Sequence, residues 1–366
     1  MTTVAVLGAG AGGLAAAVEL SAAGHRVRVW NRREATLAPY RAAGGVVAGG
    51  VLGDGFTPLP VLTTSLSEAL GGADVAVVCL PALGHRALAD DLAELGCLTP
   101  LILNPGHLLG AAHVASRFAR RRIARPPIAE LSTLTYVART GPAATVRITG
   151  TAHRVRAAAL GIDGVALEIA ADLWPACQLE KDVLVTGLAN VNLVLHPPAA
   201  IMAAAWVEAT GGEFAYYADA TTPAVAAVMA VLDNERLSLG HAFGHRLDPL
   251  AEEMLAIGTV DEIPAVGTPA ERLRIAVSTG RANASIMAPG SLEHRYYRED
   301  FAFAVVPFLE LAQVAGSAVP VAESLLRLAD CAMHGAPVRD GLRLAELGLD
   351  AADADELVDL VTNGAI

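Results

Sequence analysis

Proton transfer is the chemistry that the second half of the chain could carry out most readily. His196 stands just before Pro197-Pro198, and an imidazole, with an unperturbed pKa of about 6.5, can give or take a proton near neutrality. Asp300 or Glu299 could orient this imidazole and stabilise its charged form. Arg295 could bind a substrate carboxylate through two hydrogen bonds. Spacing alone leaves two alternatives open, a core histidine at position 196 and a surface ion pair between Arg295 and Asp300.

Phosphate binding is indicated by a glycine-rich turn near the N-terminus. The turn follows the apolar run Val4–Leu7 and precedes an alanine-rich segment, and its residues are Gly8, Ala9, Gly10, Ala11, Gly12 and Gly13. Gly8, Gly10 and Gly13 fall on the G-x-G-x-x-G spacing, which allows a tight turn, a close approach of backbone to pyrophosphate, and close packing of helix on strand. Free N–H groups and the positive end of the helix dipole would face the phosphates. The sequence predicts a dinucleotide site, with a purely structural turn as the alternative.

The end of the next expected strand, Arg26–Trp30, bears on which dinucleotide binds. An NAD site usually has Asp or Glu at this point, which accepts a hydrogen bond from the ribose 2′-hydroxyl. This chain has Asn31, Arg32 and Arg33 instead. Asn31 could still bond a ribose and either arginine could pair with a 2′-phosphate, so NADP(H) is favoured over NAD(H). The alternative is that both arginines are solvated charges past a strand end.

Two further strand ends should line the cofactor cleft, because ligands of doubly wound sheets bind at the carboxyl ends of the strands. The apolar run 74–80 ends at Pro81, and Leu101–Leu103 ends at Asn104-Pro105-Gly106. The residues predicted to contact the cofactor here are Leu80, Pro81, Asn104 and Gly106. Nearby, His85 and His107 could face the ligand or simply stand at a helix start.

Later segments of the first half are expected to extend the same sheet. Residues 128–135, 136–139 and 144–148 have the composition of strands. Glu130 and Tyr136 lie where a late strand could edge the cleft, and they are candidate substrate contacts. Ordinary strand alternation explains both residues equally well.

The second half is expected to begin with a helix from about Asp182 into Val194. This helix should end at His196-Pro197-Pro198, because the residue before a proline is pushed out of helical geometry. Asn192 stands four residues before His196 and therefore on the same side of the helix end. It is another candidate substrate contact.

The length of 366 residues suits two domains. Strand and helix signals alternate up to Trp174-Pro175, and helical periodicity dominates beyond that point. We therefore predict an α/β Rossmann dinucleotide-binding domain over residues 1–178. An all-α substrate and catalytic domain should follow over residues 179–366.

Composition and charge narrow the class of protein. Hydrophobic residues make up 54% of the chain and charged residues 17%, which is typical of a folded, soluble protein. Residues 1–178 carry 15 Arg against 12 Asp and Glu, whereas residues 179–366 carry 11 Lys and Arg against 26 Asp and Glu. The mildly basic first half suits an anionic cofactor, and the acidic second half argues against nucleic acid and anionic membranes as partners. With no signal-peptide pattern and no uninterrupted apolar run of about 20 residues, a cytoplasmic enzyme is expected.

No metal site is expected from the sequence. The four cysteines are far apart and show no C-x-x-C pairing. His241 and His245 stand four residues apart, but no glutamate adjoins the first and no third ligand is placed beside them. A solvated helix face explains this histidine pair better.

A series of motifs resembles the octopine/nopaline (opine) dehydrogenase family. Beyond the glycine turn, these motifs are Leu80-Pro81-Ala82, Leu103-Asn104-Pro105-Gly106, Glu130 followed by Tyr136-Val137-Ala138-Arg139, Asn192-x-x-x-His196-Pro197-Pro198, Tyr217, Asp233-x-Glu235-Arg236 and Arg295-Tyr296-x-x-Glu299-Asp300. The resemblance runs through about residues 1–333. Its most specific parts are the His-Pro and Arg-Tyr-x-x-Glu-Asp segments.

This resemblance implies an enzyme that condenses the amine of an amino acid with a 2-oxo acid and reduces the resulting imine with NAD(P)H. By the same resemblance, His196 is the general acid/base, Asp300 its charge partner and Arg295 a ligand of a substrate carboxylate. Two departures concern the substrate. Residues 201–205 replace a Leu-Leu-Asn-Ala-like stretch, and residues 218–220 stand where the family usually has a Glu-Gly pair.

Two other interpretations of the sequence stay open. A dehydrogenase of the hydroxyacid, ketopantoate or glycerol-3-phosphate type would reduce a C=O group, but it resembles enzymes with a catalytic lysine. The single lysine, Lys181, stands beside Glu180, where a surface ion pair is its more economical role. A non-catalytic dinucleotide-sensing protein is the second alternative, and the presence of both His196 and Asp300 argues against it. The expected partners are small-molecule substrates, and a homodimer is compatible with the sequence.

Overall fold

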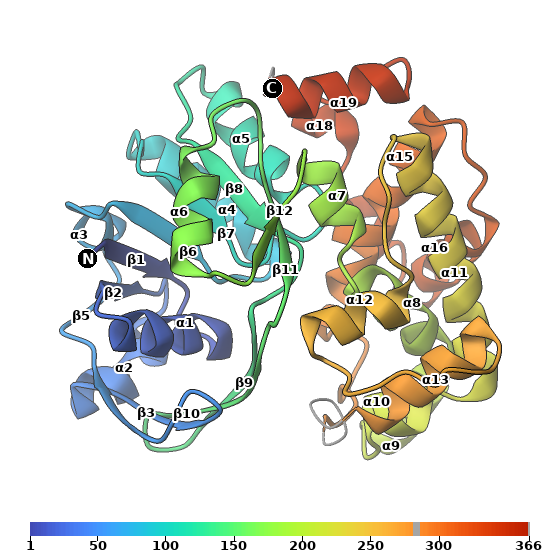
Figure 1. Cartoon of the computed structure of the whole chain (residues 1–366), viewed down its shortest axis with the longest axis horizontal. Coiled ribbons are helices and arrows are strands. Elements are labelled where there is room, and N and C mark those ends of the chain that lie inside the picture. Colours follow the sequence, from blue (N-terminus) through green and yellow to red (C-terminus); the bar gives the residue numbers. More distant parts are fainter. Residues whose placement is uncertain (281–285, 365–366) are drawn as a thin grey trace. The chain divides into compact units, whose positions relative to one another are not determined.

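The computed structural model describes residues 1–280 and 286–364, which form two compact units (Figure 1). Among the described residues, unit 1 contains Met1–Gly106, Gly110–Thr186 and Thr362–Gly364. Unit 2 contains His107–Leu109 and Gly187–Val361. The main division therefore falls a few residues after the expected boundary at 178, and two short segments belong to the other unit.

Unit 1 is built on a mostly parallel sheet with the strand order of a dinucleotide-binding fold. Its strands are β1 (Thr3–Leu7), β2 (Arg26–Trp30), β5 (Val61–Thr63), β6 (Val75–Val78), β7 (Leu101–Leu103), β8 (Ile128–Leu131), β11 (Val155–Ala159) and β12 (Cys177–Leu179). Across the sheet the order is β12-β11-β8-β7-β6-β1-β2-β5, and all neighbours from β8 to β5 pair in parallel. The chain order reverses at β1, so the glycine turn at its carboxyl end lies at the switch point where dinucleotides bind. The α/β fold class expected for this half is confirmed.

Helices connect these strands. They are α1 (Ala11–Ala22), α2 (Glu34–Ala43), α3 (Leu66–Leu70), α4 (Ala82–Glu94), α5 (Gly110–Arg120), α6 (Val165–Leu173) and α7 (Val183–Leu188). Helix α1 contacts β1 and β2, and its side chains Ala15, Ala16 and Ala17 are completely buried. Because these side chains are small, α1 lies close to the sheet and its first turn stays next to the end of β1.

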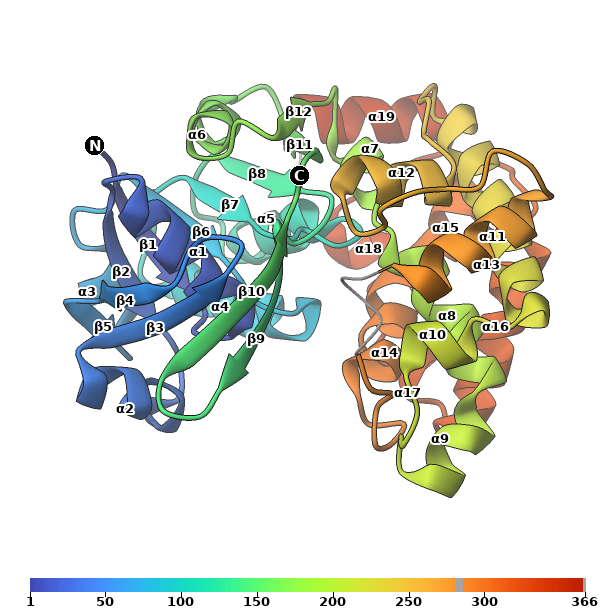
Figure 2. The same ribbon diagram turned by 60° about the horizontal axis from the view of Figure 1, so that its bottom comes forward.

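A second, smaller sheet corrects one sequence expectation. Its order is β4 (Gly55–Pro58), β3 (Gly45–Gly50), β10 (Thr145–Thr151) and β9 (Tyr136–Gly141), and β10 runs beside both β3 and β9 (Figure 2). Strands β9 and β10 therefore do not extend the main sheet as predicted. The reason is a buried anchor: the Tyr136 hydroxyl donates to Glu19 of α1 at 2.5 Å and accepts from Trp174 Nε1 at 2.9 Å. This anchor holds β9 against α1, while β11 pairs with β8 in the main sheet.

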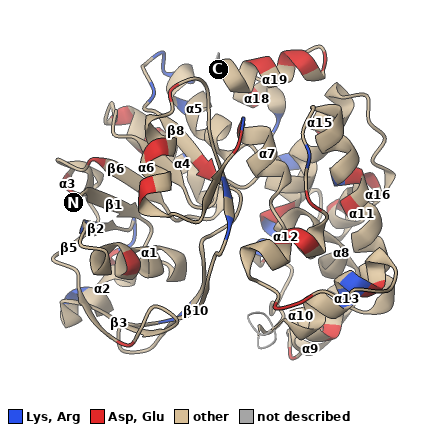
Figure 3. Ribbon diagram, in the orientation of Figure 1, with Lys and Arg blue, Asp and Glu red and all other residues tan. Residues whose placement is uncertain are grey.

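Unit 2 is helical, as predicted. Its elements are α8 (Asn192–Met202), α9 (Ala204–Thr210), α10 (Tyr216–Ala220), α11 (Pro223–Ala242), α12 (Leu250–Ile257), α13 (Pro269–Thr279), α14 (Arg295–Arg298), η1 (Phe301–Val305), α15 (Val306–Val314), α16 (Pro320–Ala332), α17 (Ala336–Asp340), α18 (Leu344–Leu347) and α19 (Ala354–Asn363). The element η1 is a π-helix that runs directly into α15. Acidic residues are prominent on α12, α16 and α19, in keeping with the acidic second half of the sequence (Figure 3).

Helix α8 differs from the sequence expectation. The predicted stop at His196-Pro197-Pro198 is wrong, because α8 begins at Asn192 and continues through both prolines to Met202. Each proline lacks the N–H that would bond one turn back, which normally ends a helix. Every residue from Leu193 to Ala200 is buried, however, and burial of this apolar surface offsets the missing hydrogen bonds.

One segment, Val183–Met202, is long and apolar enough to cross a membrane by length and composition alone. Within the structure, 89% of its most apolar window is buried inside the protein. The segment comprises α7 and α8, with polar residues at several positions. A core helix of a soluble protein passes the same test, so this segment is weak support for a membrane span.

A buried carboxyl group ties together three segments of unit 1. Glu130, in β8, is completely buried. Its Oε2 accepts from the backbone N–H of Ala111 at 2.7 Å, and its Oε1 accepts from the Thr186 hydroxyl at 2.6 Å. Burial raises the pKa of Glu130 to about 7, although these two donors pull it down. Ala111 and Thr186 adjoin the points where the chain leaves or re-enters unit 1, so Glu130 fixes both of these points.

Glu130→Gln should change how stability depends on pH. Below a pH of about 4.5 the carboxyl is protonated in both the folded and the unfolded state. Between that pH and about 7 only the unfolded state ionises, so the wild-type free energy of unfolding falls as pH rises. At roughly 1.4 kcal/mol per pH unit, the wild type should lose about 3 kcal/mol relative to Glu130→Gln over this range. Urea unfolding followed by tryptophan fluorescence at several pH values measures the difference.

Glu94→Gln is the matched control, because the Glu94 side chain is 77% exposed. The difference in unfolding free energy between the wild type and this control should stay flat between pH 4.5 and 7. A flat difference for Glu130→Gln as well would contradict the raised pKa of Glu130.

Candidate active site

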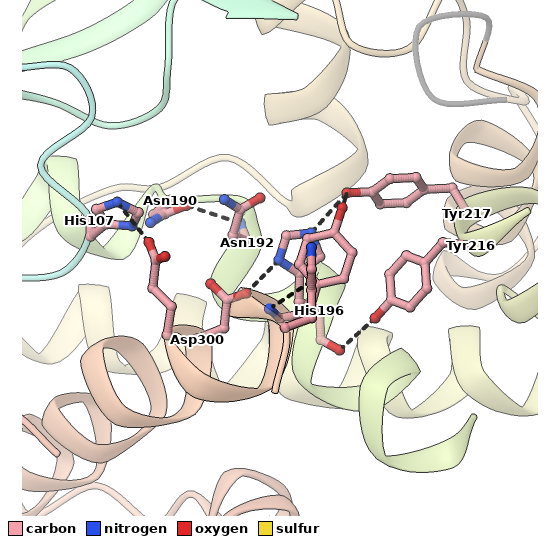
Figure 4. A network of polar contacts seen from close by, with 10 residues as sticks. His107, Asn190, Asn192, His196, Tyr216, Tyr217 and Asp300 are labelled. Carbon is pink, nitrogen blue, oxygen red and sulfur yellow. Dashed lines mark hydrogen bonds and ion pairs between the residues drawn. The ribbon is translucent and has the colours of Figure 1, made fainter. Parts of the chain in front are cut away.

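The structure brings His196 and Asp300 together in unit 2. His196 Nδ1 lies 2.7 Å from Asp300 Oδ2, and the two residues are 1% and 5% exposed (Figure 4). Because an ionised carboxylate only accepts, Nδ1 carries the proton in this contact. The other ring nitrogen, Nε2, is then the atom that gains or loses a proton during a reaction.

A group of tyrosines encloses the His196 ring. The Tyr217 hydroxyl lies 2.8 Å from His196 Nε2, and the Tyr296 ring centroid lies 4.0 Å from the imidazole centroid. Tyr216 donates to the main-chain carbonyl of His196 at 3.3 Å. The sequence motifs include Tyr217 but assign it no role. The adjacent Tyr216 is the one local feature of the sequence that indicates an aromatic pocket. These contacts hold the ring in one plane.

The geometry after α14 decides which acidic residue meets His196. Glu299 and Asp300 follow α14 directly and lead into the π-helix η1, a type of helix that is frequent at functional sites. Glu299 Oε1 lies 3.0 Å from His107 Nε2, and both side chains are buried. Burial lowers the pKa of His107 to about 4, so this imidazole is neutral at physiological pH. Of the two acids that the sequence left open, Asp300 therefore contacts His196 and Glu299 contacts His107.

Arg295 and Asn192 present polar groups to which no hydrogen bond or ion pair is assigned among the described residues. The Arg295 guanidinium carbon lies 5.7 Å from the Tyr296 ring centroid, and the residue as a whole is exposed. Partial desolvation opposes its charge, but Glu299 and other nearby groups raise the Arg295 pKa overall. Asn192 is half-buried at the start of α8, where its backbone N–H donates to Asn190 Oδ1 at 3.0 Å. Both side chains fit the role of binding a substrate's polar groups.

The glycine turn in unit 1 has the backbone geometry that a pyrophosphate site requires. Gly8 has a φ of +125°, which L side chains rarely adopt. A Cβ on Gly13 would stand 1.8 Å from the Gly8 carbonyl oxygen, so only glycine allows this packing. Gly10 is the N-cap of α1 with no side-chain cap, and a Cβ there would meet no described atom within 4 Å. The first-turn N–H groups of α1 thus point to a side where backbone can approach a phosphate, and the turn fits a dinucleotide.

The residues after β2 divide into two kinds. Asn31 is held by the protein: its Oδ1 accepts from the Ala9 N–H at 3.3 Å, and its Nδ2 donates to the Arg33 carbonyl at 3.2 Å. Arg32 and Arg33 are exposed, and no described residue forms an ion pair with either guanidinium. Asn31 therefore fixes the glycine turn, while the two arginines keep their charges available for a ligand.

The other predicted cofactor residues lie at strand ends as expected, but they differ in how far they are exposed and in whether their side chains are already bonded to the protein. Leu80 is half-buried, and its side chain packs near Gly8. Pro81 is exposed at the N-cap of α4. Asn104 is completely buried and exchanges two hydrogen bonds with Thr135, at 2.9 and 3.1 Å. A Cβ on Gly106 would meet the Glu130 side chain at 2.5 Å. Of these, Leu80 and Pro81 are the ones with exposed surface for a ligand.

Two predicted substrate contacts have structural partners instead. The Tyr136 hydroxyl is engaged by Glu19 and Trp174, and the Glu130 carboxylate by Ala111 and Thr186. Both residues are buried within unit 1. Their contacts give them roles in holding unit 1 together, and their role in substrate binding stays a prediction.

The sequence matches two known families, each over part of its length. Residues 179–333 match the family described as NAD/NADP octopine/nopaline dehydrogenase, alpha-helical domain. Residues 4–103 match ketopantoate reductase PanE/ApbA. The chain is also similar to the opine dehydrogenase of Arthrobacter sp. (strain 1C), with 28% identity over 357 residues that cover 96% of each chain. These matches confirm the resemblance seen in the sequence motifs.

Solved structures share the fold over nearly the whole chain. An octopine dehydrogenase in complex with NADH and agmatine aligns with a TM-score of 0.76 and 19% identity, covering 100% of this chain and 98% of that one. A yersinopine dehydrogenase with bound NADP+ aligns with a TM-score of 0.72 and 17% identity, covering 99% and 97%. At this level of identity the similarity establishes the architecture, a dinucleotide domain followed by a helical domain.

Gly10→Ala should weaken dinucleotide binding without unfolding unit 1. The new Cβ meets no described atom of the protein, so the melting temperature should be unchanged, but it projects where the backbone would approach a pyrophosphate. We expect Kd for NADH and for NADPH to rise about tenfold or more, which corresponds to roughly 1.4 kcal/mol. Titration of nicotinamide fluorescence measures both constants.

Gly164→Ala provides the matched control. Gly164 is likewise the N-cap of a helix, α6, with a negative φ and open space where the added methyl group would stand. This substitution should leave both dissociation constants unchanged. Equal effects of the two substitutions would mean that the turn at Gly10 does not approach the dinucleotide.

Proposed function

We propose specific catalytic and substrate-binding roles for residues of this chain. The chain is an opine dehydrogenase-like, NAD(P)-dependent oxidoreductase, and its residues 179–333 match the octopine/nopaline dehydrogenase helical-domain family. The enzyme condenses an amino acid or amine with a 2-oxo acid and reduces the resulting imine. The observation that carries the assignment of roles is the buried His196–Asp300 contact of 2.7 Å, next to an arginine with no assigned ion-pair partner among the described residues. A histidine held in this way is suited to move a proton, and such an arginine is suited to hold a carboxylate.

The condensation requires proton transfer at two points. When the amine nitrogen attacks the carbonyl carbon of the oxo acid, one proton passes from the nitrogen to the oxygen and gives a hydroxyl group. This hydroxyl group needs a second proton to leave as water. His196, as imidazolium, supplies the proton for this departure, while Asp300 keeps Nδ1 protonated and stabilises the positive charge. The C=N bond forms as the C–O bond breaks, which leaves the imine nitrogen protonated. A nicotinamide, when bound, would supply the hydride that reduces the carbon of this imine.

Arg295 and Asn192 are proposed to position the substrates. The guanidinium of Arg295 offers a two-pronged set of donors that matches a carboxylate, which both the oxo acid and the amino acid carry. Asn192 lies one helical turn before His196 on α8, so its amide can reach a group bound near the imidazole. We also propose a homodimer and a cytoplasmic location, which rest on the sequence alone.

The competing carbonyl reductases are less compatible with the residues at hand. The family match that would favour them covers residues 4–103, which is dinucleotide-binding sequence only. The sole lysine, Lys181, is exposed, and Glu180 pairs with Arg156 at 2.6 Å. Glu180, the expected partner of Lys181, therefore forms its ion pair with Arg156. A non-catalytic sensor would have no need of the paired His196 and Asp300.

We propose NADP(H) as the preferred cofactor. Two exposed guanidinium groups, Arg32 and Arg33, follow β2 at the place where the ribose 2′ position of a dinucleotide lies in this fold. No acidic residue stands at the end of β2 to accept from a 2′-hydroxyl. The amide of Asn31, which could have done so, is already bonded to the protein.

Replacing Arg32 and Arg33 together by Ala should weaken NADPH binding selectively. Loss of charge-assisted hydrogen bonds to the 2′-phosphate should raise Kd for NADPH by about tenfold to a hundredfold, at roughly 1.5–3 kcal/mol for such bonds, and leave Kd for NADH nearly constant. Fluorescence titration with both dinucleotides gives the two ratios. If the Kd values for NADPH and NADH rise by the same factor, the two arginines do not bind the 2′-phosphate.

The reaction itself is tested by omitting one substrate at a time. NAD(P)H consumption should require both an amino acid or amine and a 2-oxo acid, and a panel of paired substrates identifies the preferred combination. Consumption with the oxo acid alone would instead support the hydroxyacid type of dehydrogenase. No consumption with any pair would favour the sensing role.

Asp300→Asn serves as the inactive comparison in the same assay. An amide in place of the carboxylate cannot stabilise imidazolium, so kcat should fall by about 100-fold to 10,000-fold with dinucleotide binding unchanged. Asp340→Asn makes the same change in a half-buried ion pair with Arg298 and Arg339, and it should keep wild-type activity.

A further inference from the structure

Both ring nitrogens of His196 are occupied by protein groups. Nδ1 contacts Asp300 Oδ2 at 2.7 Å, and Nε2 contacts the Tyr217 hydroxyl at 2.8 Å (Figure 4). With Nδ1–H donated to the carboxylate, Nε2 accepts the hydroxyl proton of Tyr217 when the imidazole is neutral. The atom of His196 that should serve the substrate is therefore covered by Tyr217.

We propose that Tyr217 is a catalytic residue that passes the proton between His196 Nε2 and the substrate. This inference rests on the proposed function, because it concerns the proton that converts the carbonyl oxygen into leaving water. It assigns the direct contact with the reacting oxygen to the Tyr217 hydroxyl rather than to the imidazole.

The surroundings of His196 favour transfer through Tyr217 over rotation of the imidazole. The ring lies against Tyr296 at 4.0 Å between centroids, the carboxylate of Asp300 holds Nδ1, and the residue is 1% exposed. Turning Nε2 away from Tyr217 would break two hydrogen bonds inside a close-packed site. The imidazole is therefore fixed, and a group beyond it must carry the proton onward.

Tyr217 has the contacts that a relay group needs. It lies on α10, 8% exposed, and its hydroxyl is 3.4 Å from the Tyr296 hydroxyl, so it meets a second polar group besides His196. Burial is the main reason that the pKa of Tyr217 is raised well above its ordinary value, and the Arg295 charge acts in the opposite direction. The phenol thus stays neutral, but its oxygen lies within the field of the cation proposed to hold the substrate carboxylate.

The step balances without any charge left on Tyr217. The Tyr217 O–H bond breaks as its proton goes to the departing substrate oxygen, and the imidazolium Nε2–H bond breaks as its proton goes to the Tyr217 oxygen. His196 ends as neutral imidazole, Tyr217 regains its proton, and the substrate oxygen leaves as water. Two protons move in the same step.

Tyr217→Phe tests this role, with Tyr297→Phe as the matched control. Tyr297 is also a buried tyrosine of unit 2, but its hydroxyl donates to the Ala200 carbonyl at 3.0 Å and does not touch the imidazole. We expect kcat for the amine and oxo acid pair to fall about 100-fold in Tyr217→Phe and less than about threefold in the control, within the range of general acid catalysis. Melting temperatures of both variants identify any loss of folding.

The solvent isotope effect separates transfer from mere positioning. In the wild type, the plot of kcat against the fraction of D₂O should be curved because two protons move. In Tyr217→Phe it should be linear, with a smaller isotope effect. A kcat of Tyr217→Phe equal to or above that of the wild type overturns the proposal, and so does a reduced kcat with the wild-type curvature, which would mean that Tyr217 only positions His196.

A measurement without turnover keeps this inference distinct from the proposed function. In ¹⁵N-histidine-labelled protein, the His196 Nε2 resonance, assigned with His196→Ala, should shift in Tyr217→Phe and stay in place in Tyr297→Phe. An unshifted resonance overturns the proposal whatever the substrates are. If the resonance shifts as expected but no substrate pair consumes NAD(P)H, it is the proposed function that fails.

Discussion

The hydrogen bond between His196 Nδ1 and Asp300 is the contact on which the geometry of the site in unit 2 depends. A carboxylate that is 5% exposed is costly to bury unless a donor satisfies it, and the imidazole is that donor. The bond requires α8 and the start of η1 to lie side by side, which is consistent with a helix that continues through two prolines and with a π-helix directly after Asp300. It also fixes which ring nitrogen remains for chemistry. The contact between the Tyr217 hydroxyl and Nε2 depends on an imidazole that Asp300 holds in this orientation.

Local patterns were sufficient to predict the Rossmann architecture and the glycine turn. Apolar runs that end in Gly, Pro or Asn mark parallel strands, and the spacing of Gly8, Gly10 and Gly13 follows from backbone geometry that holds wherever the motif occurs. For the helical half, only its sequence motifs predict the family to which it is similar. The failures came where long-range packing prevails over local preference: α8 passes through its prolines because it is buried, and β9 leaves the main sheet because Tyr136 is anchored to Glu19.

The type of a side chain, when its burial and its partners are unknown, predicts the role of an individual residue poorly. Glu130 and Asp300 are both acids in strand-like or loop-like surroundings in the sequence, yet one secures two ends of unit 1 and the other holds an imidazole. The sequence offers Asn31 as a possible ribose contact, and the structure adds that its side chain fastens the glycine turn. The sequence assigns Tyr217 no role, because nothing in its neighbours, apart from Tyr216, distinguishes it from a core aromatic residue. Each of these roles depends on a partner far away in the chain, which single-sequence patterns do not encode.

The missing side-chain cap at the start of α1 has a thermodynamic consequence. The N–H groups of this first turn are left to solvent or to a bound phosphate, so the dinucleotide completes the helix as a cap would. A ligand that binds only the folded form raises its stability by mass action. Because the turn belongs wholly to unit 1, the supply of cofactor acts directly on the resistance of that unit to heat and proteolysis, and the two parts of this chain need not share a single melting transition.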